Sequence, residues 1–220
     1  ALELTEIQYL GKGNINEIAW SQKGKPIALA SSTGIYLVDP KTYAEVHFSK
    51  TASESVAFST DGTTLASAEK NLVILRDLET GNKTAVFEGH TEMVYQIAFS
   101  PGDDMLASAS QDGAIKLWDP GNGELINTID PPGTFFYDGA FLSDGKTLIA
   151  AAYSDGSQIT LWDVESGDEI EMAPKVKGSI FAISSQSETI AAGGYNDPLV
   201  LLDFNGQELL TLEKDAKLVR

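Results

Sequence analysis

The chain has 220 residues, with 15 lysine and arginine residues against 32 aspartate and glutamate residues, so its formal net charge is −17. It has no cysteine and two histidines, which excludes disulfides, thiolate metal sites and a multi-histidine metal centre within one chain. The acid excess argues against nucleic-acid binding through a basic face, and no apolar run reaches the roughly 18 residues of a membrane helix.

Taken in chain order, the sequence opens with a short apolar run at 3–9 and continues with five similar periods of four runs each. The first runs lie at 18–21, 56–59, 97–100, 139–143 and 181–185. The second runs lie at 27–32, 64–69, 105–110, 147–153 and 189–195. The third runs all end on an aspartate, 38 to 44 residues after the previous one: Asp39, Asp77, Asp119, Asp163 and Asp203. The fourth runs lie at 43–48, 83–88, 124–129, 168–172 and 208–212.

These runs are predicted to be β-strands. They have strand length, are rich in Val, Ile, Thr, Phe and Tyr, and are separated by glycine-containing turn segments such as TDGTT and ETGNK. No stretch shows a sustained helical period. Four antiparallel strands cannot bury both of their faces alone, but such sheets stacked around an axis can, which predicts an all-β β-propeller with four-stranded blades. A β-sandwich or an up-and-down barrel is the alternative, and five matched periods argue against it.

The third period carries a more specific signature. It pairs Gly89-His90 with Trp118-Asp119 and therefore resembles a WD40 repeat. The resemblance implies a buried polar chain of His90, Ser108, Asp112 and Trp118, with Ser110 as an alternative to Ser108. It favours a structural role for His90 over that of a catalytic base. His47 is interpreted as an edge or surface residue, and the other periods are expected to depend mainly on apolar packing.

The resemblance extends over 4–212 and implies one propeller domain across residues 1–220, with blades at about 11–50, 51–89, 90–131, 132–175 and 176–214. The run at 3–9 predicts an additional strand, one too many for a closed ring of five blades. The chain is interpreted either as a five-bladed ring with a surplus end or as part of a larger ring, such as the seven-bladed ring commonest in the family. An open arc would expose apolar blade faces and self-associate.

The sequence contains no nucleophile elbow, HExxH motif, phosphate loop or dinucleotide fingerprint, so no catalytic residue, metal or cofactor is expected. The predicted function is a non-catalytic scaffold that binds a protein or peptide through a loop face. The alternative is a propeller enzyme, similar to a glycoside hydrolase, with carboxylates at the central channel. The first residues, ALELTEIQYL, show no signal peptide, which fits a cytoplasmic protein and equally a part of a larger secreted or tethered one.

The predicted binding face carries the loops that enter the first strands and the turns that follow the second strands. Aligning the periods places on it, from the first-strand entries, Asn16, Glu54, Met93, Tyr95, Phe135, Tyr137 and Ser179. From the second-strand turns come Ser31, Glu69, Gln111, Tyr153 and Tyr195. Aromatic and methionine side chains surrounded by acids are typical of protein interfaces. The expected partner is a basic or amphipathic protein or peptide, with no nucleic acid and no membrane.

Overall fold

The computed structural model describes residues 13–21, 26–153, 157–170, 182–186, 189–193, 199–203 and 207–212. In these residues the regular secondary structure is entirely β-strand, arranged as five separate four-stranded antiparallel sheets. No helix that could cross a membrane is found in this part of the chain. The predicted all-β class and its four-stranded repeat are therefore confirmed, while the predicted strand at 3–9 lies outside the described residues.

Each sheet corresponds to one sequence period. The first sheet contains β1 (Ile15–Trp20), β2 (Ile27–Ser31), β3 (Gly34–Val38) and β4 (Glu45–Ser49). The second contains β5 (Val56–Phe58), β6 (Thr64–Glu69), β7 (Leu72–Asp77) and β8 (Lys83–Phe87). The third contains β9 (Val94–Phe99), β10 (Leu106–Ser110), β11 (Ile115–Trp118) and β12 (Leu125–Ile129). The fourth contains β13 (Phe135–Phe141), β14 (Thr147–Tyr153), β15 (Ser157–Asp163) and β16 (Glu169–Ile170). The fifth contains β17 (Ala182–Gln186), β18 (Thr189–Gly193), β19 (Leu199–Asp203) and β20 (Glu208–Leu212).

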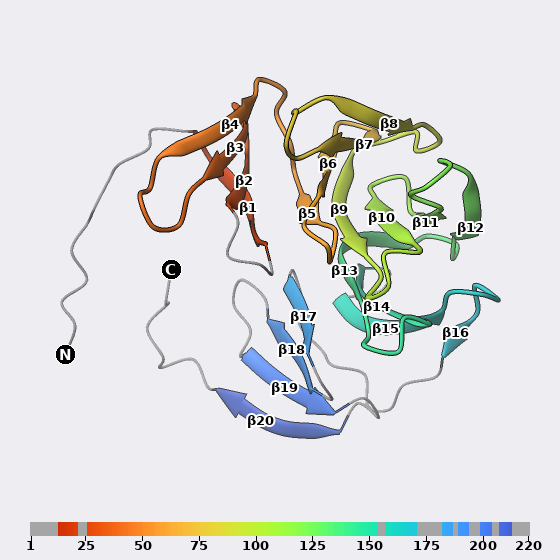
Figure 1. Cartoon of the computed structure of the whole chain (residues 1–220). Helices are drawn as coiled ribbons and strands as arrows, with labels where there is room; N and C mark the ends of the chain where they lie inside the picture. Colours follow the sequence, from red (N-terminus) through yellow and green to blue (C-terminus); the bar gives the residue numbers. More distant parts are fainter. Residues whose placement is uncertain are drawn as a thin grey trace.

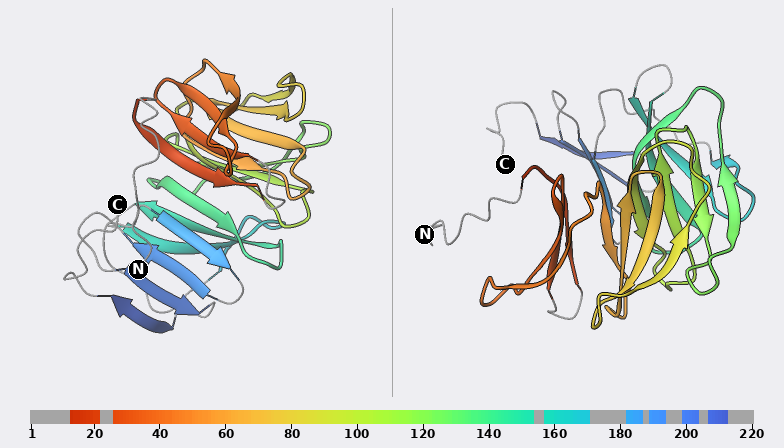
Figure 2. Two further views of the ribbon diagram at one scale, coloured as in Figure 1. Left: turned by 60° about the vertical axis from the view of Figure 1, so that its left-hand side comes forward. Right: turned by 90° about the horizontal axis from the view of Figure 1, so that it is seen from above.

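The sheets are arranged around a common centre as the blades of a propeller. Within each sheet the strands follow chain order, because a turn joins each strand to the next. In Figure 1 the sheets succeed one another clockwise from β1–β4, with the first strand of each sheet innermost and the fourth at the rim. Neighbouring first strands contact each other from β1 through β5, β9 and β13 to β17. Figure 2 shows the sheets stacked face against face.

The core lies between successive sheets and follows the two-residue period of the strands. In each of the first three sheets, small alanines on the second strand and larger aliphatic residues on the third face the next sheet. In the first sheet these are Ala28, Ala30, Ile35 and Leu37, which form one buried cluster with Val56 and Leu65 of the second sheet. The apolar alternation of the sequence therefore supplies one face to each neighbour, and this packing of one sheet on the next builds the propeller.

The outer face of the first sheet has no neighbouring sheet among the described residues. Trp20 and Ile18 of β1 are 68% and 53% exposed on this face. The residues at the register position of Ile18 in the next two sheets, Val56 and Ile97, are 1% and 2% exposed because the preceding sheet covers them. The exposed part of this face is thus its β1 edge, whereas Leu29, Tyr36 and Val38 on the same face are buried.

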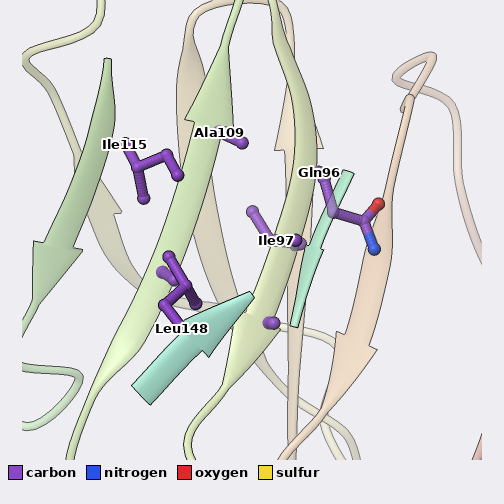
Figure 3. A pocket seen from close by; sticks show the side chains of 8 residues that line it. Gln96, Ile97, Ala109, Ile115 and Leu148 are labelled. Atoms are coloured by element: carbon purple, nitrogen blue, oxygen red, sulfur yellow. The ribbon is translucent and has the colours of Figure 1, made fainter. Parts of the chain in front are cut away.

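A small apolar cavity of about 10 Å³ lies between the third and fourth sheets. Figure 3 shows Ala109, Ile115 and Leu148 around this space, while the amide of Gln96 points away from it. Gly139 also lines the cavity. Since it occupies the register position of Ile97 in the third sheet, the space is where a side chain of the fourth sheet would stand.

Candidate functional site

A hydrogen-bonded chain of four side chains crosses the third sheet. The Trp118 Nε1–H donates to Ser108 Oγ at 2.8 Å, and the Ser108 hydroxyl lies 2.7 Å from His90 Nε2. On its other side, His90 Nδ1 lies 2.9 Å from Asp112 Oδ2. A neutral His90 that donates from Nδ1 and accepts at Nε2 satisfies every group in this chain. The structure thus brings together the four residues that the WD40 resemblance singled out, and Ser110 instead bonds to the backbone of the loop before β9.

The electrostatics of this chain suit a structural role. Burial lowers the pKa of His90, and the neighbouring Asp112 only partly opposes that effect. Burial would raise the pKa of Asp112, but the N–H groups of Thr91 and Ala114 and the His90 ring lower it overall. His90 is 4% exposed and has a partner on both ring nitrogens. A satisfied, buried imidazole of this kind holds the loop before β9 against the sheet.

The second sheet contains a buried ionic group in the place where the third sheet has its hydrogen-bonded chain of four side chains. Arg76 occupies the register position of Trp118, and it donates to Ser67 Oγ at 2.7 Å and pairs with Glu69. The second sheet therefore combines apolar packing on both neighbouring sheets with a buried polar group that the sequence did not predict. The prediction that Glu69 is a binding-face residue is wrong, because its side chain is 4% exposed and faces inward to neutralise the guanidinium. The fourth sheet has a counterpart of the Trp118–Ser108 hydrogen bond, because Trp162 Nε1–H donates to Thr160 Oγ1 at 2.8 Å.

A ring of side chains surrounds the entrance formed by the first strands. In the first, third and fourth sheets the pairing of the first strand slips by one residue, and the extra residue is Asn16, Tyr95 or Tyr137. Just before β5, Glu54 stands in the same place, since its N–H donates to the Ala68 carbonyl while the Ala68 N–H donates to the next residue. A bulge of this kind redirects the extra side chain. We call Asn16, Glu54, Tyr95 and Tyr137 the bulge ring.

The bulge ring is continuous across four sheets. Asn16 Nδ2 donates to the carbonyl of Ser53 at 3.0 Å, beside Glu54. The rings of Tyr95 and Tyr137 pack on each other with centroids 6.0 Å apart and planes tilted by 33°. Burial raises the pKa of Tyr95, and Tyr137 and the charge of Glu54 raise it further.

Two exposed apolar side chains flank the tyrosine pair. Met93 precedes β9 and is 37% exposed, and Phe135 begins β13 and is 44% exposed. Gln111 lies next to Met93, whose carbonyl accepts the Gln111 backbone N–H at 2.9 Å, and its side chain is exposed. Five of the predicted face residues therefore gather on neighbouring sheets: Met93, Tyr95, Gln111, Phe135 and Tyr137.

The remaining predicted residues divide into two groups. Ser31 is buried, and its hydroxyl donates to the Gly34 carbonyl at 2.9 Å, so it closes the β2–β3 turn and is not a surface residue. The side chains of His47 and Tyr153, and all of Ser179 and Tyr195, lie outside the part of the chain that the structure describes.

Sequence reasoning missed Glu17, which directly follows the bulge residue Asn16. Glu17 Oε2 accepts the Val56 N–H at 2.9 Å, and Oε1 accepts from Gln96 Nε2 at 3.1 Å, which ties together the first three sheets. Burial raises the pKa of Glu17, and hydrogen bonds from Ser55, Val56 and Gln96 oppose that effect. The sequence offered one signal, since Glu17 directly follows Asn16, which the alignment of the periods had placed on the binding face. Glu17 lines a central cavity of about 420 Å³, together with residues of β1, β5 and β9.

The described residues offer no reactive constellation. No three histidine, aspartate or glutamate side chains among them lie close enough to hold a metal ion. Of the described carboxylates whose pKa is shifted, only that of Glu17 is raised, and those of Asp39, Asp77, Asp112, Asp144 and Asp163 are lowered. The enzyme alternative required two perturbed carboxylates converging in one pocket, and it is not supported.

Comparisons with known proteins agree with the fold. Residues 81–119, which include β8, β9, β10 and β11 and the four residues of the hydrogen-bonded chain, match the family model described as "WD domain, G-beta repeat". The chain therefore contains a WD40 repeat and resembles WD40-repeat proteins. It is 36% identical over 117 residues to the transcriptional corepressor LEUNIG_HOMOLOG of Arabidopsis thaliana, covering 52% of this chain and 14% of that protein. It is 31% identical over 110 residues to the small ribosomal subunit protein RACK1 of Caenorhabditis elegans, covering 50% of this chain and 33% of that protein.

The WD40 architecture is shared with solved structures. The structure of U3-55K superposes on 90% of this chain with a TM-score of 0.77 and 18% sequence identity. At that identity the likeness shows the fold alone. The chain spans 64% of U3-55K and smaller shares of the two curated relatives, so their activities and partners are not transferred with the fold.

Proposed function

We propose that this WD40 propeller is a non-catalytic scaffold that binds a protein or peptide on the face around the bulge ring. The observation that carries the proposal is the packed pair Tyr95–Tyr137, flanked by exposed Met93 and Phe135 on two neighbouring sheets. Aromatic and methionine side chains provide large contact area with little loss of side-chain freedom, and a few such residues dominate the energy of interfaces. The bulges fix them at strand ends rather than on long loops.

The partner is proposed to be basic or amphipathic. The net charge of −17 favours association with positively charged surfaces, and Glu54 and Glu17 place carboxylates beside the tyrosines and in the central cavity. The relatives support a scaffold in general terms, since one is named a transcriptional corepressor and the other a protein of the small ribosomal subunit, which is itself an assembly.

Two further statements belong to the same proposal. The chain forms one propeller domain over residues 1–220, with blades near 11–50, 51–89, 90–131, 132–175 and 176–214, either as a five-bladed ring with a surplus end or as part of a larger ring. The exposed Ile18 and Trp20 on the outer face of the first sheet then favour self-association.

A peptide-display selection tests the binding face. Peptides selected from a random library on the intact chain are expected to combine basic and apolar residues. The double variant Tyr95→Ala, Tyr137→Ala should bind them at least about tenfold more weakly, because interface hot spots cost more than about 1.4 kcal/mol on truncation. Tyr43→Ala is the matched control, because Tyr43 is 42% exposed in the β3–β4 turn. Equal binding by the double variant, with its thermal unfolding unchanged, would show that the bulge ring is not the docking face.

A further inference from the structure

The bulge ring places two tyrosine rings and a carboxylate at equivalent positions of three neighbouring sheets. Tyr95 and Tyr137 lie on adjacent sheets with their planes tilted by 33°, and both are partly exposed. Glu54 comes from the sheet on the other side of Tyr95, and its side chain is also partly exposed. The same local device, an extra residue at the start of the first strand, therefore brings two partly exposed tyrosine rings and one carboxylate to the same entrance.

The electrostatic surroundings of this pair are acidic. The groups that shift the pKa of Tyr95 beyond its burial are Tyr137 and Glu54, and both raise it, whereas a basic neighbour would lower it. One residue deeper, Glu17 keeps a carboxylate in a largely buried position with its oxygens held by the Val56 N–H and the Gln96 amide. The side chain of Glu54 on the neighbouring sheet therefore favours a cation beside the tyrosines.

We infer that the bulge ring binds the guanidinium group of an arginine side chain, which stacks on the Tyr95–Tyr137 pair and is neutralised by Glu54. A guanidinium is flat, permanently charged and weakly hydrated, so it combines stacking on an aromatic face with hydrogen bonds to a carboxylate. The inference rests on the proposed function, because it names the group of the partner that this face recognises.

The test uses the chain with its tyrosines labelled with ¹³C and the small probe N-acetyl-L-arginine amide. Resonances of Tyr95 and Tyr137 are assigned with Tyr95→Phe and Tyr137→Phe, and the probe is then titrated into the unmutated protein. Both resonances should shift and saturate, while that of Tyr43, in the β3–β4 turn, stays unchanged. N-acetyl-L-citrulline amide, which has nearly the same shape without the charge, should bind at least about threefold more weakly, as expected for loss of a cation–π contact.

Glu54→Gln tests the role of the carboxylate and should weaken the arginine probe by about threefold or more. Glu165→Gln, in the exposed turn before β16, changes the net charge equally and should leave binding unchanged. Equal binding of the two probes, or an unchanged affinity in Glu54→Gln, would overturn the inference. If the tyrosine double variant still loses the selected peptides in that case, the proposed docking face stands and only the arginine site fails. If arginine binds as expected but the peptides are unaffected by that variant, the docking face is wrong and the cation site remains.

Discussion

An aspartate stands at the end of each third strand or directly after it, and its role is local. Asp39 Oδ1 accepts the N–H groups of Lys41 and Thr42, both at 2.8 Å. Asp163 receives the same pair of bonds from the two turn residues Glu165 and Ser166. Backbone donors of this kind favour the ionised form, and the pKa of Asp39 is accordingly lowered by Thr42 and Lys41. The repeated carboxylates therefore close the turns before the outer strands and are not reactive groups.

At His90 the buried hydrogen bonds predict a pH dependence of stability. The pKa of His90 is lowered in the folded chain, so on acidification the unfolded chain takes up a proton first. The contribution of His90 is thus complete above the ordinary histidine pKa of about 6.5, and it is lost as the pH falls from there toward the lower folded value. The midpoint of thermal unfolding, measured by circular dichroism at pH 7.5 and 5.5, is expected to fall by more in the unmutated chain than in His90→Gln.

The comparison with the variant is needed because other groups titrate over the same range. His47 and the many carboxylates are present in both proteins, and their contribution cancels in the difference. The raised pKa of Glu17 has the opposite sign, because a carboxyl of this kind stabilises the fold at low pH and loses that effect as the pH rises. Identical pH dependence in the two proteins would mean that His90 does not titrate differently on folding.

At the scale of the element, the first strand of the fourth sheet departs from its neighbours at one position. Gly139 stands where the second and third sheets have Val56 and Ile97, and a cavity of about 10 Å³ remains beside it. A Cβ atom at Gly139 would lie 3.4 Å from the Ile149 carbonyl oxygen, which is a normal contact distance. The strand can therefore accept one methyl group at this point, whereas a larger side chain has no space.

Gly139→Ala is expected to stabilise the chain by about 0.5–1 kcal/mol, because it restricts the unfolded backbone and places apolar volume in an existing space. Urea unfolding followed by tryptophan fluorescence should show a higher midpoint. Gly133→Ala provides a control of opposite sign, because Gly133 has a φ of +68° with nothing near its Cβ position, so strain alone should destabilise that variant. A lower midpoint for Gly139→Ala would show that β13 cannot accommodate even a methyl group.

Most of the architecture could be predicted from the sequence because each strand lies between turn residues that fix its ends. The alignment of the periods also matches the observed register, since Ile18, Val56 and Ile97 all pair with the same position of their second strands. The direction of individual side chains was harder to predict. Glu69 was assigned to the binding face because the alignment placed it in the turn after a second strand, yet Arg76 within an apolar third strand required a buried counter-ion.

The bulges explain both the success and the failure at the candidate site. Tyr95 and Tyr137 were aligned correctly as equivalent residues, but neither bulge residue is itself a glycine or proline that would mark the one-residue slip in pairing. Glu17, which follows the bulge residue of the first sheet, was therefore not recognised as part of the entrance. Polar contacts between sheets, such as that of Glu17 with Gln96, join residues far apart in the sequence and depend on the arrangement of whole sheets.

For the whole molecule, the exposed apolar side chains of β1 depart from the packing seen between the other described sheets. On the outer face of the first sheet, Ile18 and Trp20 pair with Leu29 and Ile27 of β2, and Leu29 is itself buried. In the fifth sheet, Leu199 is 42% exposed. At the register position of Ile18, the second and third sheets have side chains covered by a neighbouring sheet, so burial of Ile18 and Trp20 against another surface is favourable.

Self-association of the chain should therefore depend on Trp20. Sedimentation-velocity measurements over a hundredfold range of concentration are expected to show a dimer whose fraction rises with concentration, because two copies can bury Ile18 and Trp20 against each other. Trp20→Ser removes the largest exposed apolar side chain of the face and should shift this equilibrium toward monomer by about tenfold or more, as a buried aromatic side chain is worth roughly 1.5–3 kcal/mol. Tyr43→Ser, in an exposed turn away from this face, should leave the equilibrium unchanged. A chain that remains monomeric at every concentration, or oligomers that are insensitive to Trp20→Ser, would show that the first sheet does not mediate association between copies.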